Sequence, residues 1–201
     1  MPDTLFPTFL KLAGLPVLVV GGGSVAAGKL EALSQAGARV TVVAPDICGA
    51  VTRSGVDICQ RPFVEADLDG VWFVVSAATP EVNRAVAAAA RDRRLFVNAV
   101  DDPPNATAYL GGVVRRSSVT LAVSTSGRAP ALAGLLREAL EGALPAEAEL
   151  EAWFTTADAL KAEWRSTGIP MANRRPHLAE ALVRRYCGTL ACCREAGRGR
   201  E

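Results

Sequence analysis

The chain has 201 residues, enough for one sizeable hydrophobic core but with little room for two independent modules. Its 22 Lys and Arg residues nearly balance its 21 Asp and Glu residues, so the formal charge of +1 provides no global field that would attract nucleic acid or an acidic membrane. No apolar stretch approaches the roughly 20 residues of a membrane span, and the first residues lack the pattern of a secretory signal. We therefore expect a cytoplasmic protein with no nucleic-acid partner and no membrane partner.

The five cysteines form an odd number without CxxC spacing, which indicates reduced thiols rather than a disulfide framework or a standard zinc site. His177 and the thiols of Cys187, Cys192 and Cys193 could hold a soft metal if the end of the chain folded back. A buried Cys187 followed by two thiols in a tail is the simpler interpretation. We predict no metal site.

The first strong structural signal is an apolar run at residues 15–20 that leads directly into three glycines. Such a run is typical of a buried parallel strand. Apolar residues then recur at spacings of four and three, which predicts a helix that ends near Gly37. Residues 39–44 predict a second strand and complete a strand–helix–strand unit of about 30 residues.

The alternation of strands and helices continues to about residue 105. Residues 56–60 form a weaker strand pattern, residues 71–76 a fully apolar one, and residues 95–98 a third, with a helix that begins at Pro80 between the last two. This order predicts an α/β fold, in which a parallel sheet is covered on both faces by helices.

The pattern changes after residue 105. Residues 108–114 and 119–123 are two β-type segments separated by only four polar residues, which predicts an antiparallel hairpin. Beyond Pro130 the periodicity is helical, and its apolar stripes need partners from this chain or from a second copy. We predict a first domain over residues 1–105, a small β/α segment over residues 106–144, and a helical C-terminal lobe over residues 145–201.

The glycine-rich turn carries the first functional signal. Gly21-x-Gly23-x-x-Ala26 matches the dinucleotide-binding fingerprint of a Rossmann-type domain, and it lies between a strand and a helix as that fingerprint requires. The glycines permit a tight turn and let backbone amides approach a pyrophosphate at the helix N-terminus. The alternative is a turn that only packs the helix against the strand.

The residue at the end of the second predicted strand indicates whether such a domain binds NAD or NADP. An acidic residue that binds the adenosine ribose would lie there, but that position is Ala44, and Asp46 is the nearest substitute. Arg53 is too far along the chain to argue for a 2'-phosphate. We expect NAD rather than NADP.

Two further segments follow strands at the same edge of the predicted sheet, where such sheets bind ligands. The small residues 77–79 would let a nucleotide lie close. Asp101 and Asp102 follow the next strand, and a carboxylate there is a candidate general acid or base, although it could instead only shape the proline-containing turn. The predicted cofactor-binding residues are Gly21, Gly22, Gly23, Ser24, Val25, Ala44, Asp46, Ala77, Ala78 and Thr79.

Residues 124–130 precede a leucine-rich helix. Their hydroxyls, free amides and Arg128 form a candidate anion pocket. Ordinary helix capping explains the same residue types.

Together and in this order, the motifs resemble the precorrin-2 dehydrogenase module of siroheme synthases, a family that also includes stand-alone enzymes. The resemblance covers residues 6 to about 145 and includes Phe6-Pro7, residues 17–23 with Lys29, residues 37–45, residues 77–83, Asn98-x-Val-Asp101, and residues 122–138. Relatives commonly have an aromatic-Ile-x-Pro segment where this chain has residues 108–111, and an acidic residue at the position of Arg115.

The resemblance implies oxidation of precorrin-2 to sirohydrochlorin with NAD as hydride acceptor, in a homodimer joined through the middle segment. It makes Asp101 the catalytic residue. The predicted substrate-binding residues are Asn98, Arg116, Ser124, Thr125, Ser126 and Arg128. Two alternatives stay open, a bifunctional enzyme that also inserts iron into sirohydrochlorin and a non-catalytic module that senses a dinucleotide.

Overall fold

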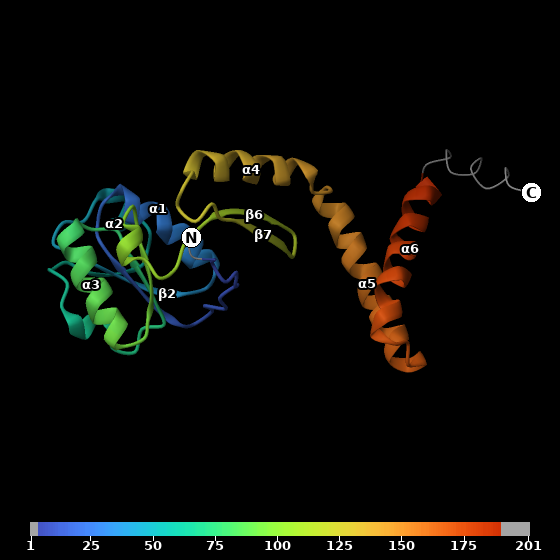
Figure 1. Ribbon diagram of the computed structural model, residues 1–201, viewed down its shortest axis with the longest axis horizontal. Helices are drawn as coiled ribbons and strands as arrows, with labels where there is room; N and C mark the ends of the chain where they lie inside the picture. Colours follow the sequence, from blue (N-terminus) through green and yellow to red (C-terminus); the bar gives the residue numbers. More distant parts are fainter. Residues whose placement is uncertain (1–3, 190–201) are drawn as a thin grey trace, which may run out of the picture. The chain divides into compact units, whose positions relative to one another are not determined.

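The computed structural model describes residues 4–189 and divides the chain into two compact units. Unit 1 consists of Met1–Gly111 and Ser124–Ala133, and unit 2 consists of Gly112–Val123 and Gly134–Glu201 (Figure 1). The three-part division expected from the sequence stays a prediction, because these two units interleave along the chain.

Unit 1 is built on a five-stranded parallel sheet. Its strand order, β3-β2-β1-β4-β5, is that of the Rossmann-type fold, so the predicted fold class is confirmed. The strands are β1 (Pro16–Val20), β2 (Arg39–Val43), β3 (Asp57–Cys59), β4 (Phe73–Ser76) and β5 (Phe96–Ala99).

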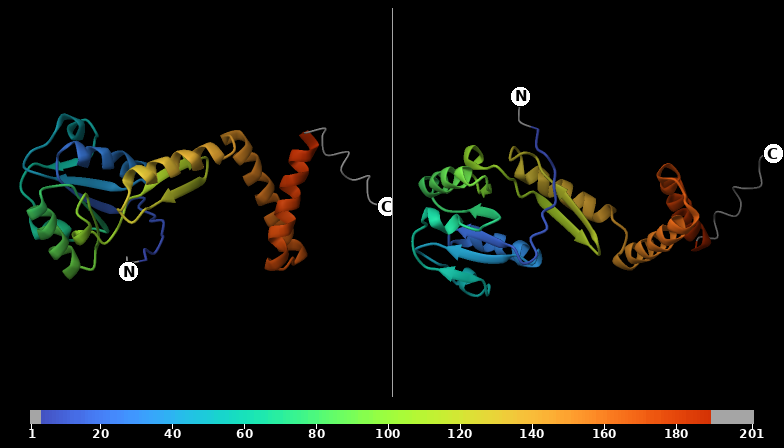
Figure 2. Two further views of the ribbon diagram at one scale, coloured as in Figure 1. Left: turned by 45° about the horizontal axis from the view of Figure 1, so that its top comes forward. Right: turned by 90° about the horizontal axis from the view of Figure 1, so that it is seen from below.

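Two long helices cover opposite faces of this sheet, as the ribbon views show (Figure 2). Helix α1 (Ser24–Gln35) begins after Gly23, and helix α3 (Pro80–Asp92) has Pro80 in its first turn, where proline needs no hydrogen-bond partner. The shorter elements of this unit are α2 (Gly49–Thr52), η1 (Glu65–Leu68) and η2 (Pro103–Asn105).

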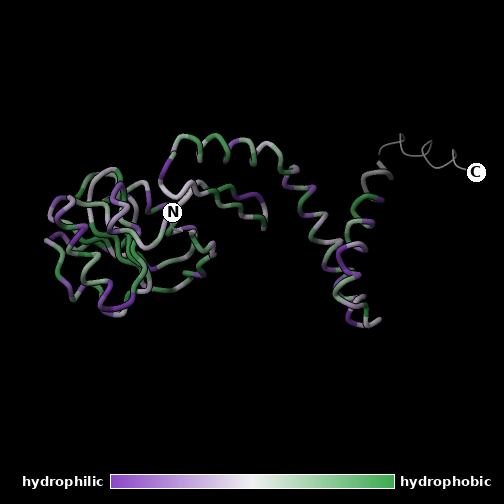
Figure 3. The backbone as a smooth tube through the Cα atoms, in the orientation of Figure 1, coloured by the Kyte–Doolittle hydropathy of each residue, from purple (hydrophilic) through white to green (hydrophobic). Residues whose placement is uncertain are grey.

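The hydrophobic core of unit 1 has one layer on each face of the sheet. One layer packs the strands against Leu30 and Leu33 of α1, and the other packs them against Val86 and Ala90 of α3. Figure 3 shows the corresponding concentration of hydrophobic residues along the strands. The strands are buried on both faces, which is why they were recognisable as continuous apolar runs.

Unit 2 contains an antiparallel hairpin and helices. The hairpin pairs β6 (Gly112–Arg116) with β7 (Val119–Val123), as predicted. The expected start of its first strand at residue 108 is wrong, because the N–H groups of Thr107 and Ala108 donate to the Val97 carbonyl of β5 instead. The connection is also shorter than the four residues expected. The helices are α4 (Pro130–Ala143), whose first residues belong to unit 1, α5 (Glu147–Thr167) and α6 (Met171–Thr189).

In residues 4–189, no helix is both long enough and apolar enough to cross a membrane.

Candidate functional site

In-register pairing aligns the last residues of four adjacent strands at one edge of the sheet. The residues that follow these strand ends are Ala44, Gly21, Ala77 and Val100. Backbone hydrogen bonds continue the register one step further, from Gly21 N to Val43 O at 3.0 Å and from Ala77 N to Val20 O at 2.8 Å. The segments that the sequence singled out therefore meet at the carboxyl edge of the sheet.

The three glycines of the turn have different roles. Gly21 has φ +125°, and a Cβ there would overlap the Ala77 carbonyl oxygen and lie 2.7 Å from its carbonyl carbon. A Cβ at Gly22 would overlap the Asp46 carbonyl oxygen. A Cβ at Gly23 would have no neighbour within 4 Å. Packing requires the first two glycines, whereas the third leaves an open space beside the helix.

The open space at Gly23 lies beside the first amide groups of α1. Gly23 is the N-cap of the 12-residue helix α1, provides no side-chain cap, and is followed by no acidic residue in the first turn. The first amide groups of a helix have no intrahelical acceptor and carry the positive end of the helix dipole. Backbone donors of Ser24 and Val25 are thus suited to a diphosphate.

Small residues and carboxylates surround one pocket of about 330 Å³ at this edge, which we call the Asp101 pocket. The lining residues come from the first turn of α1, the loop between β4 and α3, and the turn after β5. They are Val25, Ala77, Ala78, Pro80, Asn83, Val100, Asp101 and Asp102. The structure thus brings predicted cofactor-binding residues together with the predicted catalytic residue.

The two neighbouring carboxylates differ in their surroundings. Asp102 Oδ2 accepts a hydrogen bond from Asn105 Nδ2 at 2.8 Å, which stabilises the turn. Asp101 is exposed, has a left-handed φ of +55°, and makes no side-chain hydrogen bond or ion pair with the side chains of residues 4–184 or the backbone of residues 4–189. The turn-shaping role therefore belongs to Asp102, and Asp101 is free to act on a ligand.

A buried polar group at this pocket was not among the predicted site residues. Asn83 is 3% exposed, and its Oδ1 accepts hydrogen bonds from Ser76 Oγ at 2.6 Å and from the Ala78 amide at 3.2 Å. This network fixes the loop after β4. Its sequence signal was a polar residue on the buried face of an otherwise apolar helical stripe.

Asn98 lies on β5 and is 7% exposed. Its Nδ2 donates to the Ala108 carbonyl at 3.0 Å, which sets the orientation of the amide. Its Oδ1 is buried and has no hydrogen-bond partner in the described part of the chain. A buried acceptor without a donor is costly, so this oxygen is a candidate contact for a bound molecule.

The loop before α4 uses its hydroxyl groups on its own backbone. Ser124 Oγ accepts from the Ser126 amide at 3.2 Å, and Thr125 Oγ1 accepts from the Ala129 amide at 3.3 Å. Ser126 has a positive φ of +53°, and Gly127 lies beside the ring of Tyr109. Both hydroxyl groups thus accept hydrogen bonds from amides of the loop itself, ahead of Pro130 where α4 begins, and the anion-pocket interpretation stays a prediction.

Other predicted residues lie as follows. Ala44 is buried and Asp46 is exposed, and Thr79 is the N-cap of α3. In unit 2, the Arg116 guanidinium donates to the Leu144 and Pro145 carbonyls at 2.5 and 3.0 Å, a contact that closes the end of α4. Arg128 lies in the loop before α4 and is exposed.

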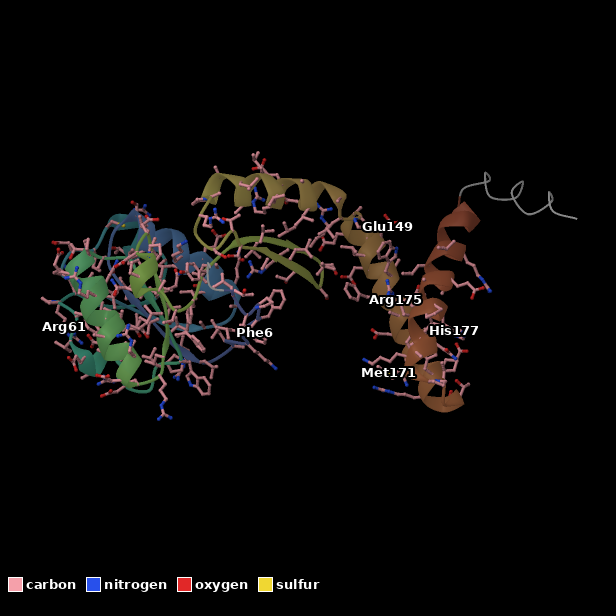
Figure 4. The ribbon with its side chains drawn as sticks, in the orientation of Figure 1. Phe6, Arg61, Glu149, Met171, Arg175 and His177 are labelled. Carbon is pink, nitrogen blue, oxygen red and sulfur yellow. The ribbon has the colours of Figure 1, made fainter. Side chains whose placement is uncertain are left out.

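The metal interpretation involves residues near the C-terminus. His177 is exposed on α6 (Figure 4), and Cys192 and Cys193 lie outside the described residues. The side chain of Cys187 is likewise outside the described part of the chain. Among the side chains of residues 4–184, no three His, Cys, Asp or Glu residues are grouped so that they could hold a metal ion.

The strand order, the glycine turn and the pocket at the carboxyl edge define a dinucleotide-binding domain of the Rossmann type. Residues 8–112 match a protein-family model described as "Putative NAD(P)-binding", and the chain belongs to this family.

Two relatives of this chain are siroheme synthases. Siroheme synthase 1 of Aeromonas salmonicida is 39% identical over 174 residues, and the siroheme synthase of Ectopseudomonas mendocina is 43% identical over 143 residues. These alignments cover 84% and 70% of this chain but only 37% and 31% of the relatives. The chain thus spans about a third of the length of these relatives. The resemblance inferred from the motifs is confirmed.

A solved structure named "SirC, precorrin-2 dehydrogenase" has the same fold. It matches with a TM-score of 0.68 and 24% sequence identity, and the match covers 93% of this chain and 94% of that one.

Proposed function

We propose that the protein catalyses the NAD-dependent dehydrogenation of precorrin-2 to sirohydrochlorin. The family is NAD(P)-binding, the relatives are siroheme synthases, and a protein of the same fold is a precorrin-2 dehydrogenase. The observation that carries the proposal is the Asp101 pocket, where the loop after β4 and the first turn of α1 lie beside a free carboxylate.

The cofactor would lie along the carboxyl edge of the sheet. The amides of Ser24 and Val25 would hold its pyrophosphate over Gly23, and residues 77–79 would face its nicotinamide half. Ala44 and Asp46 lie after β2, where an adenosine ribose is bound in this fold. When bound there, NAD supplies the acceptor for a hydride.

Asp101 would act as the general base that accepts the proton released in the reaction. Removal of a hydride from precorrin-2 leaves a cationic macrocycle that must lose a proton. A carboxylate that is exposed and makes no hydrogen bond to other residues can accept this proton. It can also stabilise the positive charge of the macrocycle until the proton is lost. Asp102 is less suited to this role because its Oδ2 is already held by Asn105.

Precorrin-2 is a polycarboxylate, so its binding requires local positive charge and hydrogen-bond donors. Arg128 and the hydroxyls of Ser124, Thr125 and Ser126 would supply these groups, and the free Oδ1 of Asn98 would accept a hydrogen bond from the macrocycle. Arg116 belongs to this proposed set, although its guanidinium already binds two carbonyls within unit 2.

The proposal is tested by anaerobic incubation with precorrin-2 and NAD, while the absorption spectrum of sirohydrochlorin is followed. Wild-type protein should form it, and Asp101→Asn should lose at least 100-fold in kcat with NAD affinity nearly unchanged. Asp102→Asn is the matched control and should retain most of the activity. Dinucleotide binding without any turnover would favour a sensing module instead.

We further infer a homodimer that works in the cytoplasm. Four leucines of α4 are between 40% and 64% exposed. A single copy of the chain thus leaves this apolar surface in contact with water, which is unfavourable. They are Leu132, Leu135, Leu136 and Leu140. Light scattering after size exclusion should give twice the mass of the chain, and a monomer at micromolar concentration would contradict this inference.

A further inference from the structure

A second pocket of unit 1 lies apart from the glycine turn and shares no lining residue with the Asp101 pocket. It has a volume of about 230 Å³ and lies between the C-terminal half of α3, the start of β5, and η2 with the segment that follows it. We call it the arginine pocket. Its lining residues are Ala87, Arg91, Arg94, Leu95, Phe96, Val97, Pro104, Asn105 and Thr107.

Two guanidinium groups without counterions line this pocket. Neither Arg91 nor Arg94 makes a side-chain hydrogen bond or an ion pair within the described part of the chain. Their neighbour Arg93, in contrast, is paired with Asp69 at 3.0 Å. Both arginines are exposed, and their positive charges are therefore available to an anion.

The backbone at Arg94 is unusual for an arginine. The Leu95 amide donates to Ala90 O at 2.9 Å and the Arg94 amide donates to Arg91 O at 3.0 Å, which is the hydrogen-bond pattern of a Schellman helix end. The residue at this position has φ +57° and is usually glycine. A positive charge near the C-terminus of a helix is stabilising. Arg91 and Arg93 in the preceding turn already supply such charges, so this effect does not explain why an arginine adopts the strained conformation at position 94.

The rest of the pocket combines an aromatic wall with polar groups. Phe96 is 59% exposed, which is high for a large apolar side chain at the edge of a sheet. Thr107 Oγ1 accepts a hydrogen bond from the Val97 amide at 2.8 Å, so its own hydrogen is free to be donated. The pocket can therefore bind a ligand that carries both an aromatic ring and an anionic group.

The volume limits the size of the ligand. Pockets for drug-sized molecules occupy roughly 300–1,000 Å³, so about 230 Å³ is too small for a dinucleotide or a tetrapyrrole. A single aromatic ring with one or two carboxylates fits this volume. Its carboxylates would meet the arginines, and its ring would lie against Phe96.

We propose that the arginine pocket is a binding site for a small aromatic carboxylate, separate from the dinucleotide site. The acidic group binds Arg91 and Arg94, and Thr107 donates a further hydrogen bond.

The test uses phthalate as the probe and isothermal titration calorimetry on the full chain. Wild-type protein should bind phthalate with a millimolar or lower Kd, and Arg94→Gly should weaken this binding at least tenfold. Because glycine adopts the left-handed conformation without strain, the melting temperature of Arg94→Gly should rise by about 2 °C. Loss of binding in this variant would therefore not result from unfolding.

Two controls complete the experiment. Arg93→Gln removes a neighbouring arginine that does not line the pocket, and it should leave phthalate binding unchanged. Inorganic phosphate tests the aromatic wall and should bind at least tenfold more weakly than phthalate. The proposal is overturned if wild-type protein does not bind phthalate at millimolar concentration, if Arg94→Gly binds it equally well, or if phosphate binds with the same affinity. NAD titration of Arg94→Gly should match wild type, so failure here is distinguishable from failure of the dehydrogenase proposal.

Discussion

Replacing glycines of the turn one at a time separates the glycine that shapes the fold from the glycine that leaves room for the cofactor. Gly21→Ala would place a methyl group against the Ala77 backbone at φ +125°, whereas Gly23→Ala would place one in open space at φ −85°. The first change should damage the fold, and the second should damage dinucleotide binding.

The geometry sets the expected magnitudes. A non-glycine residue at such a φ costs about 1–3 kcal/mol, and the overlap with a fixed backbone carbonyl costs a further 1–3 kcal/mol or so. A total of about 4 kcal/mol is a large part of the 5–15 kcal/mol or so that stabilises a domain, and it corresponds to a fall of about 12 °C in Tm. Gly23→Ala only replaces a helix cap by a poorer one, which costs about 0.5–1 kcal/mol and about 2 °C.

Binding should show the opposite order. A methyl group at position 23 would lie where the pyrophosphate approaches the first amides of α1, and loss of one charge-assisted hydrogen bond costs about 1.5–3 kcal/mol. The Kd of Gly23→Ala for NAD should therefore rise roughly 10- to 100-fold. Thermal melting and fluorescence titration with NAD measure the two effects. Wild-type NAD affinity in Gly23→Ala would refute the placement of the pyrophosphate, and a wild-type Tm in Gly21→Ala would refute the described turn.

Two further predictions concern polar groups of unit 1. Asn83→Ala should lower Tm by about 6 °C and weaken NAD binding, because it leaves the Ser76 hydroxyl and the Ala78 amide without their acceptor; Ser76→Ala, which removes one of these bonds, should have a smaller effect on both measurements. The hydrogen bond from Arg61 (Figure 4) holds the pKa of Asp67 below its ordinary value, so this pair stabilises the fold above the unfolded-state pKa near 4, and the stabilisation is lost as the pH falls through the lower folded-state pKa. At pH 7, Asp67→Asn should be less stable than wild type by about 1 kcal/mol in urea unfolding, a difference that should shrink toward zero in strong acid; a difference independent of pH would contradict this cause.

Sequence patterns predicted the sheet of unit 1 well because its strands are buried on both faces. The apolar runs that became β1 and β4 lie between two layers of helix, so almost every residue had to be hydrophobic. The glycine turn was also recognisable, because its requirement is local. What the sequence could not separate was the packing role of Gly21 from the open space at Gly23, since that depends on Ala77, which is distant in the chain.

Predictions were weaker where one residue has two plausible partners. Ala108 has the apolar, β-type surroundings of a strand residue, but its amide pairs with the edge of β5 before the hairpin begins. The prediction of Arg116 as a substrate-binding residue stays untested, but the sequence did not reveal that its guanidinium also holds the carbonyls that follow α4. In both cases an exposed strand edge or a helix end supplies a backbone acceptor that no sequence pattern reveals.

The conformation of Asp101 makes the proposed catalytic test unusually specific. Among non-glycine residues, Asp and Asn adopt the left-handed region most readily, so asparagine should keep φ +55° with little strain. It also keeps the size of the side chain, so Asp101→Asn removes essentially the negative charge and the ability to accept a proton. Asp101→Ala, in contrast, would add backbone strain of about 1 kcal/mol and confuse a structural loss with a chemical one. An Asp101→Asn variant that melts like wild type, binds NAD normally and fails to turn over would therefore assign the loss to the carboxylate itself.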